Sequence, residues 1–173
     1  INGGREEPYL GEKRVLVPSP NVATYDLKPE MSCREVAEEV LSAIKNPEYK
    51  LIIVNFANGD MVGHTAVKEA IIKAMEELDN AIGEVVCEAI GANISTLITA
   101  DHGNVDEINN PDTGNPNTQH SLNPVPCIVI DNNRKWKIIN NKGGLSNISP
   151  TVLKLMDIKK PKEMTSDSLI EEY

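Results

Sequence analysis

Short apolar runs alternate along the chain with longer segments whose apolar residues recur at helical spacing. Four runs rich in Val and Ile have the length and composition of buried strands, and they cover residues 14–17, 51–56, 95–99 and 125–130. Helical spacing is found over residues 32–45, about 65–90 and 148–156. This alternation predicts an α/β fold, a three-layer domain with a mostly parallel sheet flanked by helices.

Local signals mark the ends of these elements. Ser32 followed by Glu35 has the form of a capping box at the start of the first helix. The sequence Gly91-Ala92-Asn93 is a typical stop signal for the long helix. Residues 9–31 and 103–126 are interrupted by Pro, Asn and Gly, which predicts loops. A connection as long as the second one is usually functional or disordered.

Length and composition are those of an ordinary globular protein. The 173 residues suit one domain covering 1–173, since no linker divides them. Hydrophobic residues make up 40% of the chain, and no apolar run approaches the roughly 20 residues that a membrane span needs. The net charge of −9 argues against a nucleic-acid partner, because such proteins usually carry clustered Lys and Arg.

The cysteines and the first residues bear on location and completeness. Three widely spaced cysteines, with no CxxC pair, favour reduced thiols in a cytoplasmic protein over a disulfide framework. No basic, apolar leader opens the chain. Because the sequence begins at Ile1 without a Met, we expect an excised or truncated piece of a longer protein.

Asp60 and His64 directly follow the apolar run at 51–56, within Asn58-Gly59-Asp60-Met61-Val62-Gly63-His64. In open α/β sheets, ligands bind at the ends of strands where such residues lie. If a helical turn begins near Asp60, the spacing of four places both side chains on one face, close enough to share a metal ion. The alternative is an Asp that caps the helix, followed by an exposed His.

Asp101 and His102 form a second pair that follows the run at 95–99 in the same way. His120 precedes the run at 125–130 and is the natural third nitrogen ligand. Carboxylates and imidazoles together suit Mn²⁺, Zn²⁺, Co²⁺ or Mg²⁺, and the absence of Cys ligands argues against a structural zinc site. These five residues are enough for one complete three-residue metal site and half of another. Two ions about 3.5 to 4 Å apart are a common device for phosphoryl transfer.

The runs at 58–65, 99–104 and 21–31 resemble those of the cofactor-independent phosphoglycerate mutases, members of the alkaline phosphatase superfamily. The opening Asn2-Gly3-Gly4 and the closing residues 161–165 also fit this family. The resemblance covers essentially the whole chain, with several motifs in order. It implies an alkaline-phosphatase-like core whose N-terminal part is missing.

The resemblance also implies a role for each candidate ligand. Asp60, His64 and His120 would bind one Mn²⁺ ion, and Asp101 and His102 would belong to a second. In the family, an Asp and a Ser from an N-terminal segment complete the second site, and that Ser is transiently phosphorylated. Neither motif is present here, and the family's inserted transferase domain is missing as well. We therefore expect no catalytic nucleophile in this chain.

The full-length protein, by this resemblance, interconverts 3-phosphoglycerate and 2-phosphoglycerate in glycolysis, as a monomer without nucleic-acid or membrane partners. The isolated chain is expected to be inactive. One alternative is another metal-dependent enzyme of the superfamily, such as a phosphopentomutase or a phosphodiesterase. A second is a binding module that keeps the ligands without the chemistry.

Overall fold

The structure is a computed structural model that describes residues 5, 7–140 and 142–173. The Asn2-Gly3-Gly4 motif lies outside the described residues. Contacts divide the chain into two compact units, and each is described by itself. The first comprises Ile1–Glu88 with Gly103–Asn123, and the second comprises Ala89–His102 with Pro124–Tyr173.

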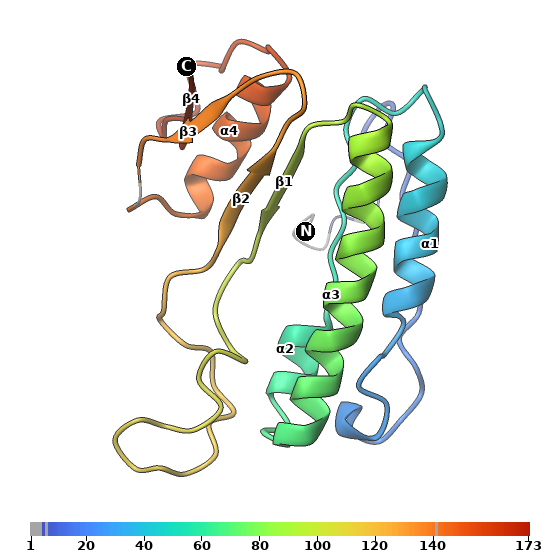
Figure 1. Cartoon of the computed structure of the whole chain (residues 1–173), viewed down its shortest axis with the longest axis vertical. Coiled ribbons are helices and arrows are strands. Elements are labelled where there is room, and N and C mark those ends of the chain that lie inside the picture. Colours follow the sequence, from blue (N-terminus) through green and yellow to red (C-terminus); the bar gives the residue numbers. More distant parts are fainter. Residues whose placement is uncertain (1–4, 6, 141) are drawn as a thin grey trace. The chain divides into compact units, whose positions relative to one another are not determined.

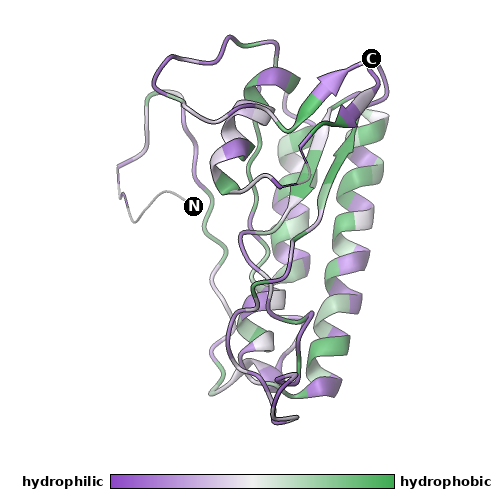
Figure 2. Cartoon of the chain, turned by 90° about the vertical axis from the view of Figure 1, so that its left-hand side faces the viewer, coloured by the Kyte–Doolittle hydropathy of each residue, from purple (hydrophilic) through white to green (hydrophobic). Residues whose placement is uncertain are grey.

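Two amphipathic helices pack against each other in the first unit (Figure 1). They are α1 (Cys33–Ile44) and α3 (Lys68–Gly91), which confirms both helices that the periodicity predicts. Both alternate apolar and polar residues along their length, as Figure 2 shows. Their shared core contains the buried side chains of Cys33, Ala37 and Ala81, because these recur at helical spacing on the facing sides.

A short helix, α2 (Asn58–Gly63), is anchored by a second core cluster in the same unit. Val62 of α2 is fully buried, and it packs with Met31 from the segment before α1 and with Ala70, Ile71 and Ala74 from α3. Because α2 is held on its apolar side, the direction of its polar side chains is fixed. This helix carries two of the candidate metal ligands.

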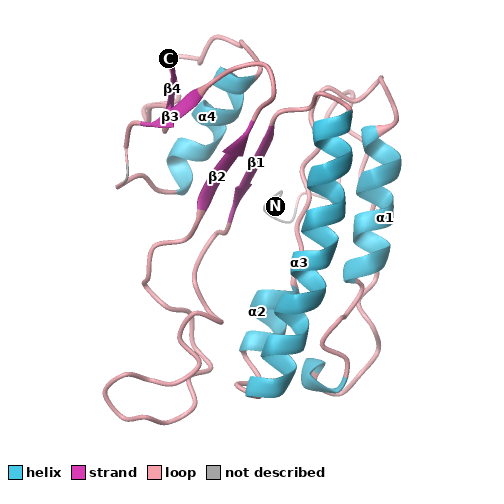
Figure 3. Cartoon of the chain, viewed as in Figure 1, coloured by secondary structure: helices cyan, strands magenta, loops and turns pink. Residues whose placement is uncertain are grey.

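Three local expectations in this unit are wrong. The runs at 14–17 and 51–56 form no strand, and Figure 3 shows the chain between α1 and α2 as loop. A strand needs a hydrogen-bonded partner, and neither run joins a ladder in the described part of the chain. Their side chains are accordingly open, with Leu16 92% and Ile53 65% exposed. The Ser32 hydroxyl makes no capping bond, because it donates to the Pro18 carbonyl at 2.7 Å.

The second unit contains two antiparallel strand pairs and a helix. Strand β1 (Thr96–Thr99) pairs with β2 (Cys127–Ile130), and β3 (Trp136–Ile138) pairs with β4 (Ile170–Glu172). Helix α4 (Ile148–Leu155) contributes to their core, together with Leu169 and Ile170. The strands expected near 95–99 and 125–130 and the last helix are confirmed.

The mixed α/β class is confirmed, but the strand pairing differs from the expected mostly parallel sheet. Both pairs in the described residues are antiparallel. A parallel pair needs a crossover connection that is usually helical, whereas β1 and β2 are joined by an irregular loop after which the chain runs back. No helix in the described part of the chain is both long and apolar enough to span a membrane.

Candidate metal centre

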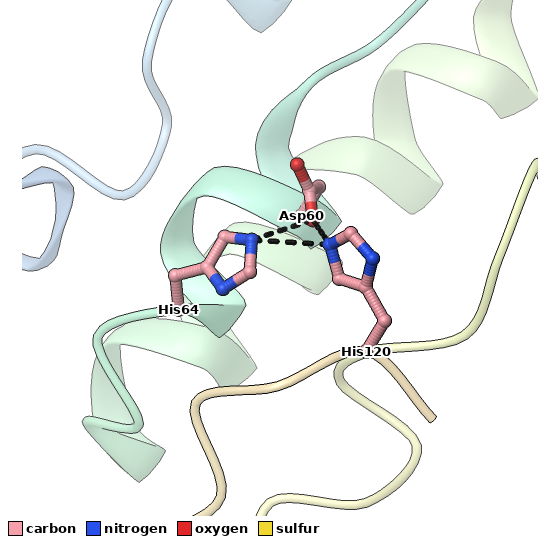
Figure 4. A group of neighbouring side chains, drawn as sticks. All are labelled: Asp60, His64 and His120. Atoms are coloured by element: carbon pink, nitrogen blue, oxygen red, sulfur yellow. Dashed lines mark hydrogen bonds and ion pairs between the residues drawn. The ribbon is translucent and has the colours of Figure 1, made fainter. Parts of the chain in front are cut away.

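Asp60, His64 and His120 lie together in the first unit, where one ligand atom from each is within 4.8 Å of the others (Figure 4). His64 Nε2 is 3.1 Å and His120 Nε2 is 3.0 Å from the same carboxylate oxygen, Oδ1 of Asp60. The two Nε2 atoms are 3.2 Å apart. This close convergence of a carboxylate and two imidazoles is a typical ligand set for a divalent metal ion.

Helix α2 aligns the first two ligands. Asp60 and His64 are four residues apart, and the backbone N–H of His64 donates to the Asp60 carbonyl at 3.1 Å, as in a regular helical turn. Their side chains therefore point to the same side. The capping role that was the alternative for Asp60 does not apply, because Asp60 is the third residue of the helix, and Ala57 is the residue before its first turn.

The segment at 21–31 is attached to α2 through Asn58. This residue is 2% exposed, and its Nδ2 donates to the carbonyls of Pro29 at 3.0 Å and Glu30 at 2.9 Å. A surface hollow of about 350 Å³ lies between the two segments, and Tyr25 and His64 contribute to its lining. Two of the three motifs are therefore in contact beside the candidate metal ligands.

The orientation of His64 is set by a backbone carbonyl. His64 Nδ1 is 2.7 Å from the carbonyl oxygen of Thr118, which can only accept, so Nδ1 carries the hydrogen. In the neutral ring this leaves the lone pair on Nε2, the atom that faces Asp60 and His120. A hydrogen bond of this kind fixes the tautomer and the ring direction of metal-binding histidines.

A network of polar contacts supports the loop that carries His120. Ser121 donates its hydroxyl to Asp106 Oδ2 at 2.7 Å, and its backbone N–H donates to the Gly103 carbonyl at 2.9 Å. Asn123 Nδ2 also donates to Asp106 Oδ2 at 2.7 Å. Burial raises the pKa of Asp106, but the hydrogen bonds from Asn123, Ser121 and the backbone lower it more, so the net direction is down. The Asp106 carboxylate therefore stays ionised, and it holds the residues that follow His120 against the start of the same loop.

Glycine at position 103 allows this network to close. A Cβ at that position would lie 2.2 Å from Ser121 Oγ and 2.7 Å from Asp106 Oδ1. No side chain fits at such distances without displacing the network. The Gly in the sequence Asp101-His102-Gly103-Asn104 is therefore needed for close packing of the loop.

Access to the three ligands remains open. Exposed fractions of the side chains are 36% for Asp60, 40% for His64 and 46% for His120. Structural metal sites are usually closed, whereas catalytic sites keep a position for water or substrate. The exposure therefore favours a site at which an ion could also contact a ligand from solution.

Asp101 and His102 belong to the second unit, where they follow β1 as expected. The Asp101 side chain is 77% exposed, and its Oδ1 is 3.6 Å from His102 Nε2. The structure thus brings together three of the five expected ligands within one unit. The assignment of Asp101 and His102 to a second ion stays a prediction.

Sequence reasoning missed three contributors to the site: Asn104, Asp106 and the Thr118 carbonyl. Asn104 is the last residue of the motif at 99–104 and Asp106 follows it, but only the Asp and His of this motif suggest metal ligands. Their proximity to that motif was the available signal. The Thr118 carbonyl belongs to the backbone, so the residue type at position 118 does not indicate its contact with His64.

Comparison with known proteins also points to a class of metalloenzymes. The model of the metalloenzyme superfamily matches residues 1–160, and the chain belongs to that superfamily. Within it, the chain is 49% identical over 171 residues to a 2,3-bisphosphoglycerate-independent phosphoglycerate mutase of Bacteroides fragilis. It is 48% identical over 170 residues to phosphoglycerate mutase 1 of this type from Methanosarcina barkeri. The resemblance to this family of mutases is confirmed.

These matches cover the chain almost completely but the relatives only in part. They include 99% and 98% of this chain, against 33% and 32% of the two relatives. A crystal structure of Leishmania mexicana phosphoglycerate mutase at low cobalt concentration superposes with a TM-score of 0.83 at 31% identity, covering 91% of this chain and 31% of that one. The chain therefore spans about a third of the length of the proteins it matches.

Proposed function

We propose that this chain is the metal-binding part of a phosphoglycerate mutase that interconverts 3-phosphoglycerate and 2-phosphoglycerate with the help of two divalent ions, Mn²⁺ by preference. The observation that carries the proposal is the convergence of Asp60, His64 and His120 within 4.8 Å, in a chain about half identical to named mutases. A protein with this role works in the cytoplasm, as a monomer, without nucleic-acid or membrane partners.

The residues present fit a divalent ion. A carboxylate and two imidazoles converge, and the contact between His64 Nδ1 and Thr118 leaves Nε2 as the ligand atom. When bound, such an ion polarises a phosphoryl oxygen and stabilises the charge that develops during transfer. The chain itself holds the ligands in place, two on α2 and one on the supported loop.

We assign the second ion to Asp101 and His102, with further ligands from outside this chain. Two ligands are too few for a stable site of this kind, which usually needs at least three from the protein. The first site should therefore bind an ion measurably in the isolated chain, and the second should not.

Metal binding can be tested by calorimetric titration of the 173-residue chain with Mn²⁺. One site is expected. His64→Ala should weaken Mn²⁺ binding strongly, because one of three ligands is lost, whereas His102→Ala, the matched control, should leave it unchanged. Two equivalent sites, or undiminished binding in His64→Ala, would contradict the assignment.

The isolated chain should not catalyse the mutase reaction, because no described serine has the setting of a metal-activated nucleophile. Ser121 is next to His120, yet it is 7% exposed and donates its hydroxyl to Asp106. Substrate positioning, which can account for about 7 to 11 kcal/mol of a barrier, would also be incomplete.

This expectation is tested by incubating the purified chain with 3-phosphoglycerate and Mn²⁺. No 2-phosphoglycerate should form. The same assay on Asp101→Ala is the control. Product formed by the chain and lost in the variant would mean that a nucleophile lies within these residues.

A further inference from the structure

Asn104, the last residue of the motif at 99–104, contacts the candidate metal ligand Asp60. The residue is 7% exposed, and its Nδ2 lies 3.0 Å from Asp60 Oδ1 and 3.3 Å from the Asp60 carbonyl oxygen. Both Asp60 atoms are acceptors, so the amide donates to the carboxylate and to the first turn of α2 at once. The carboxylate oxygen that receives this bond is the one that both imidazoles approach.

Close packing holds Asn104 in this position. A Cβ on Gly63 of α2 would lie 2.2 Å from Asn104 Oδ1, 2.7 Å from its Cγ and 3.1 Å from Val105. The space is therefore filled by the amide itself, and only glycine at position 63 allows it. Because the side chain is buried and confined on this side, its NH₂ group stays directed at Asp60.

We propose that Asn104 is a positioning residue for the metal ligand Asp60. This proposal rests on the proposed function, in which Asp60, His64 and His120 bind a divalent ion. An Asp side chain alone turns about two bonds, and its oxygens exchange places readily. The amide removes this freedom, so that the carboxylate is oriented before an ion arrives. Partners of this kind typically change metal affinity about 10- to 100-fold when they are removed.

A merely structural role for Asn104 makes a different prediction. If the side chain only packed the loop against α2, its removal would weaken metal binding whether or not Asp60 was present. If it acts through the Asp60 carboxylate, its removal should have no effect once that carboxylate is gone. A double-mutant cycle separates the two roles.

The experiment is a calorimetric titration with Co²⁺, which binds nitrogen ligands more tightly than Mn²⁺ and so permits measurement of weakened variants. Asn104→Ala should weaken binding about 10- to 100-fold. In the Asp60→Ala background, His64 and His120 still offer two nitrogen ligands that hold Co²⁺ weakly, and there the same substitution should change the weakened affinity less than about twofold. Asn132→Ala is the matched control, because that amide donates to the Ile90 carbonyl at 2.9 Å within the second unit and contacts no ligand, and it should bind Co²⁺ like the unmodified chain.

The outcomes are distinguishable. If the unmodified chain bound no Co²⁺, or if His64→Ala bound Co²⁺ as tightly as the unmodified chain, the metal site itself would be refuted together with this inference. Unchanged affinity in Asn104→Ala, or an equal loss in the Asp60→Ala background, would overturn the role of Asn104 alone. Should Asn104→Ala fail to unfold cooperatively without metal, Asn104→Leu, which keeps the branched shape without the donor, takes its place in the cycle.

Discussion

Replacing Asp131 by Asn should destabilise the second unit, because this carboxylate organises the turn between β2 and β3. Its side chain is 2% exposed. It accepts hydrogen bonds from Trp136 Nε1 at 2.8 Å, from Ser95 Oγ at 3.0 Å and from the backbone N–H of Asn133 at 2.9 Å. The Arg134 guanidinium approaches it at 3.4 Å.

The size of the effect follows from the pKa of Asp131. Burial raises this pKa, but the hydrogen bonds from Trp136, Asn133, Ser95 and the Arg134 backbone lower it more, from an ordinary 3.8 to about 2. Each pH unit of difference corresponds to about 1.36 kcal/mol, so the folded state favours the ionised form by about 2 kcal/mol. Because the folded pKa is the lower one, this contribution is complete above pH 3.8 and is lost as the pH falls to about 2.

Asn has the shape of Asp, but its neutral oxygen is a weaker acceptor and its NH₂ group faces other donors. Asp131→Asn should therefore unfold with a free energy about 2 kcal/mol lower at pH 7, and the difference should shrink as the pH approaches about 2.5. Urea unfolding followed by fluorescence measures this directly, since Trp136 is the single tryptophan of the chain.

Asp157→Asn is the matched control. Asp157 pairs with the same Arg134 but is 81% exposed, so its replacement should cost much less. An Asp131→Asn loss that stayed constant between pH 7 and about pH 2.5 would refute the electrostatic reasoning. Equal losses in the two variants would refute the role assigned to burial.

Three further substitutions test the first unit by urea unfolding. Gly63→Ala should cost about 1 to 3 kcal/mol and weaken Mn²⁺ binding, because its Cβ would lie 2.2 Å from Asn104 Oδ1; an unchanged chain would show that the loop yields freely. Asn58→Ala should cost about 1 to 3 kcal/mol for each of the two carbonyls it leaves without a donor, and a smaller loss would mean that water replaces the amide. Arg34→Ala should barely move the unfolding midpoint, since its pair with Glu84 is exposed; a clear shift would contradict this.

Helices could be predicted from the sequence because their signal repeats over many residues. Helix α3 extends over 24 residues, so several apolar positions define its buried face. Strands β3 and β4 have three residues each, too few for an apolar pattern that predicts them. Their position depends on the Asp131 turn, whose hydrogen bonds join residues far apart in the chain, such as Ser95, and no local pattern encodes these contacts.

The run at 51–56 shows the limit of apolar composition as a signal. Its residues have strand preferences, but preference alone does not form a strand when no ladder partner satisfies the backbone. The expected capping box failed for a related reason. Ser32 and Glu35 have the right spacing, yet the Pro18 carbonyl, 14 residues earlier, competes successfully for the Ser32 hydroxyl.

Within the site, the predictable part was the part set by spacing. Asp60 and His64 are one helical turn apart, so their common face followed from the sequence once a helix was assumed. His120 was predicted from its residue type and its loop. Its meeting with Asp60, 60 residues away, depends on the network around Asp106 and on the close approach at Gly103, which only the three-dimensional structure reveals.

The negative charge of the chain is a physical reason why position 104 has a neutral amide and not a carboxylate. The chain carries a net charge of −9, while the proposed substrate is a phosphate anion. A divalent ion held by one carboxylate and two neutral imidazoles retains about one unit of positive charge, which could attract that anion. A second carboxylate beside Asp60 would cancel this charge. Asn104 can orient the ligand without adding negative charge, so the positive field of the ion is preserved where the substrate would bind.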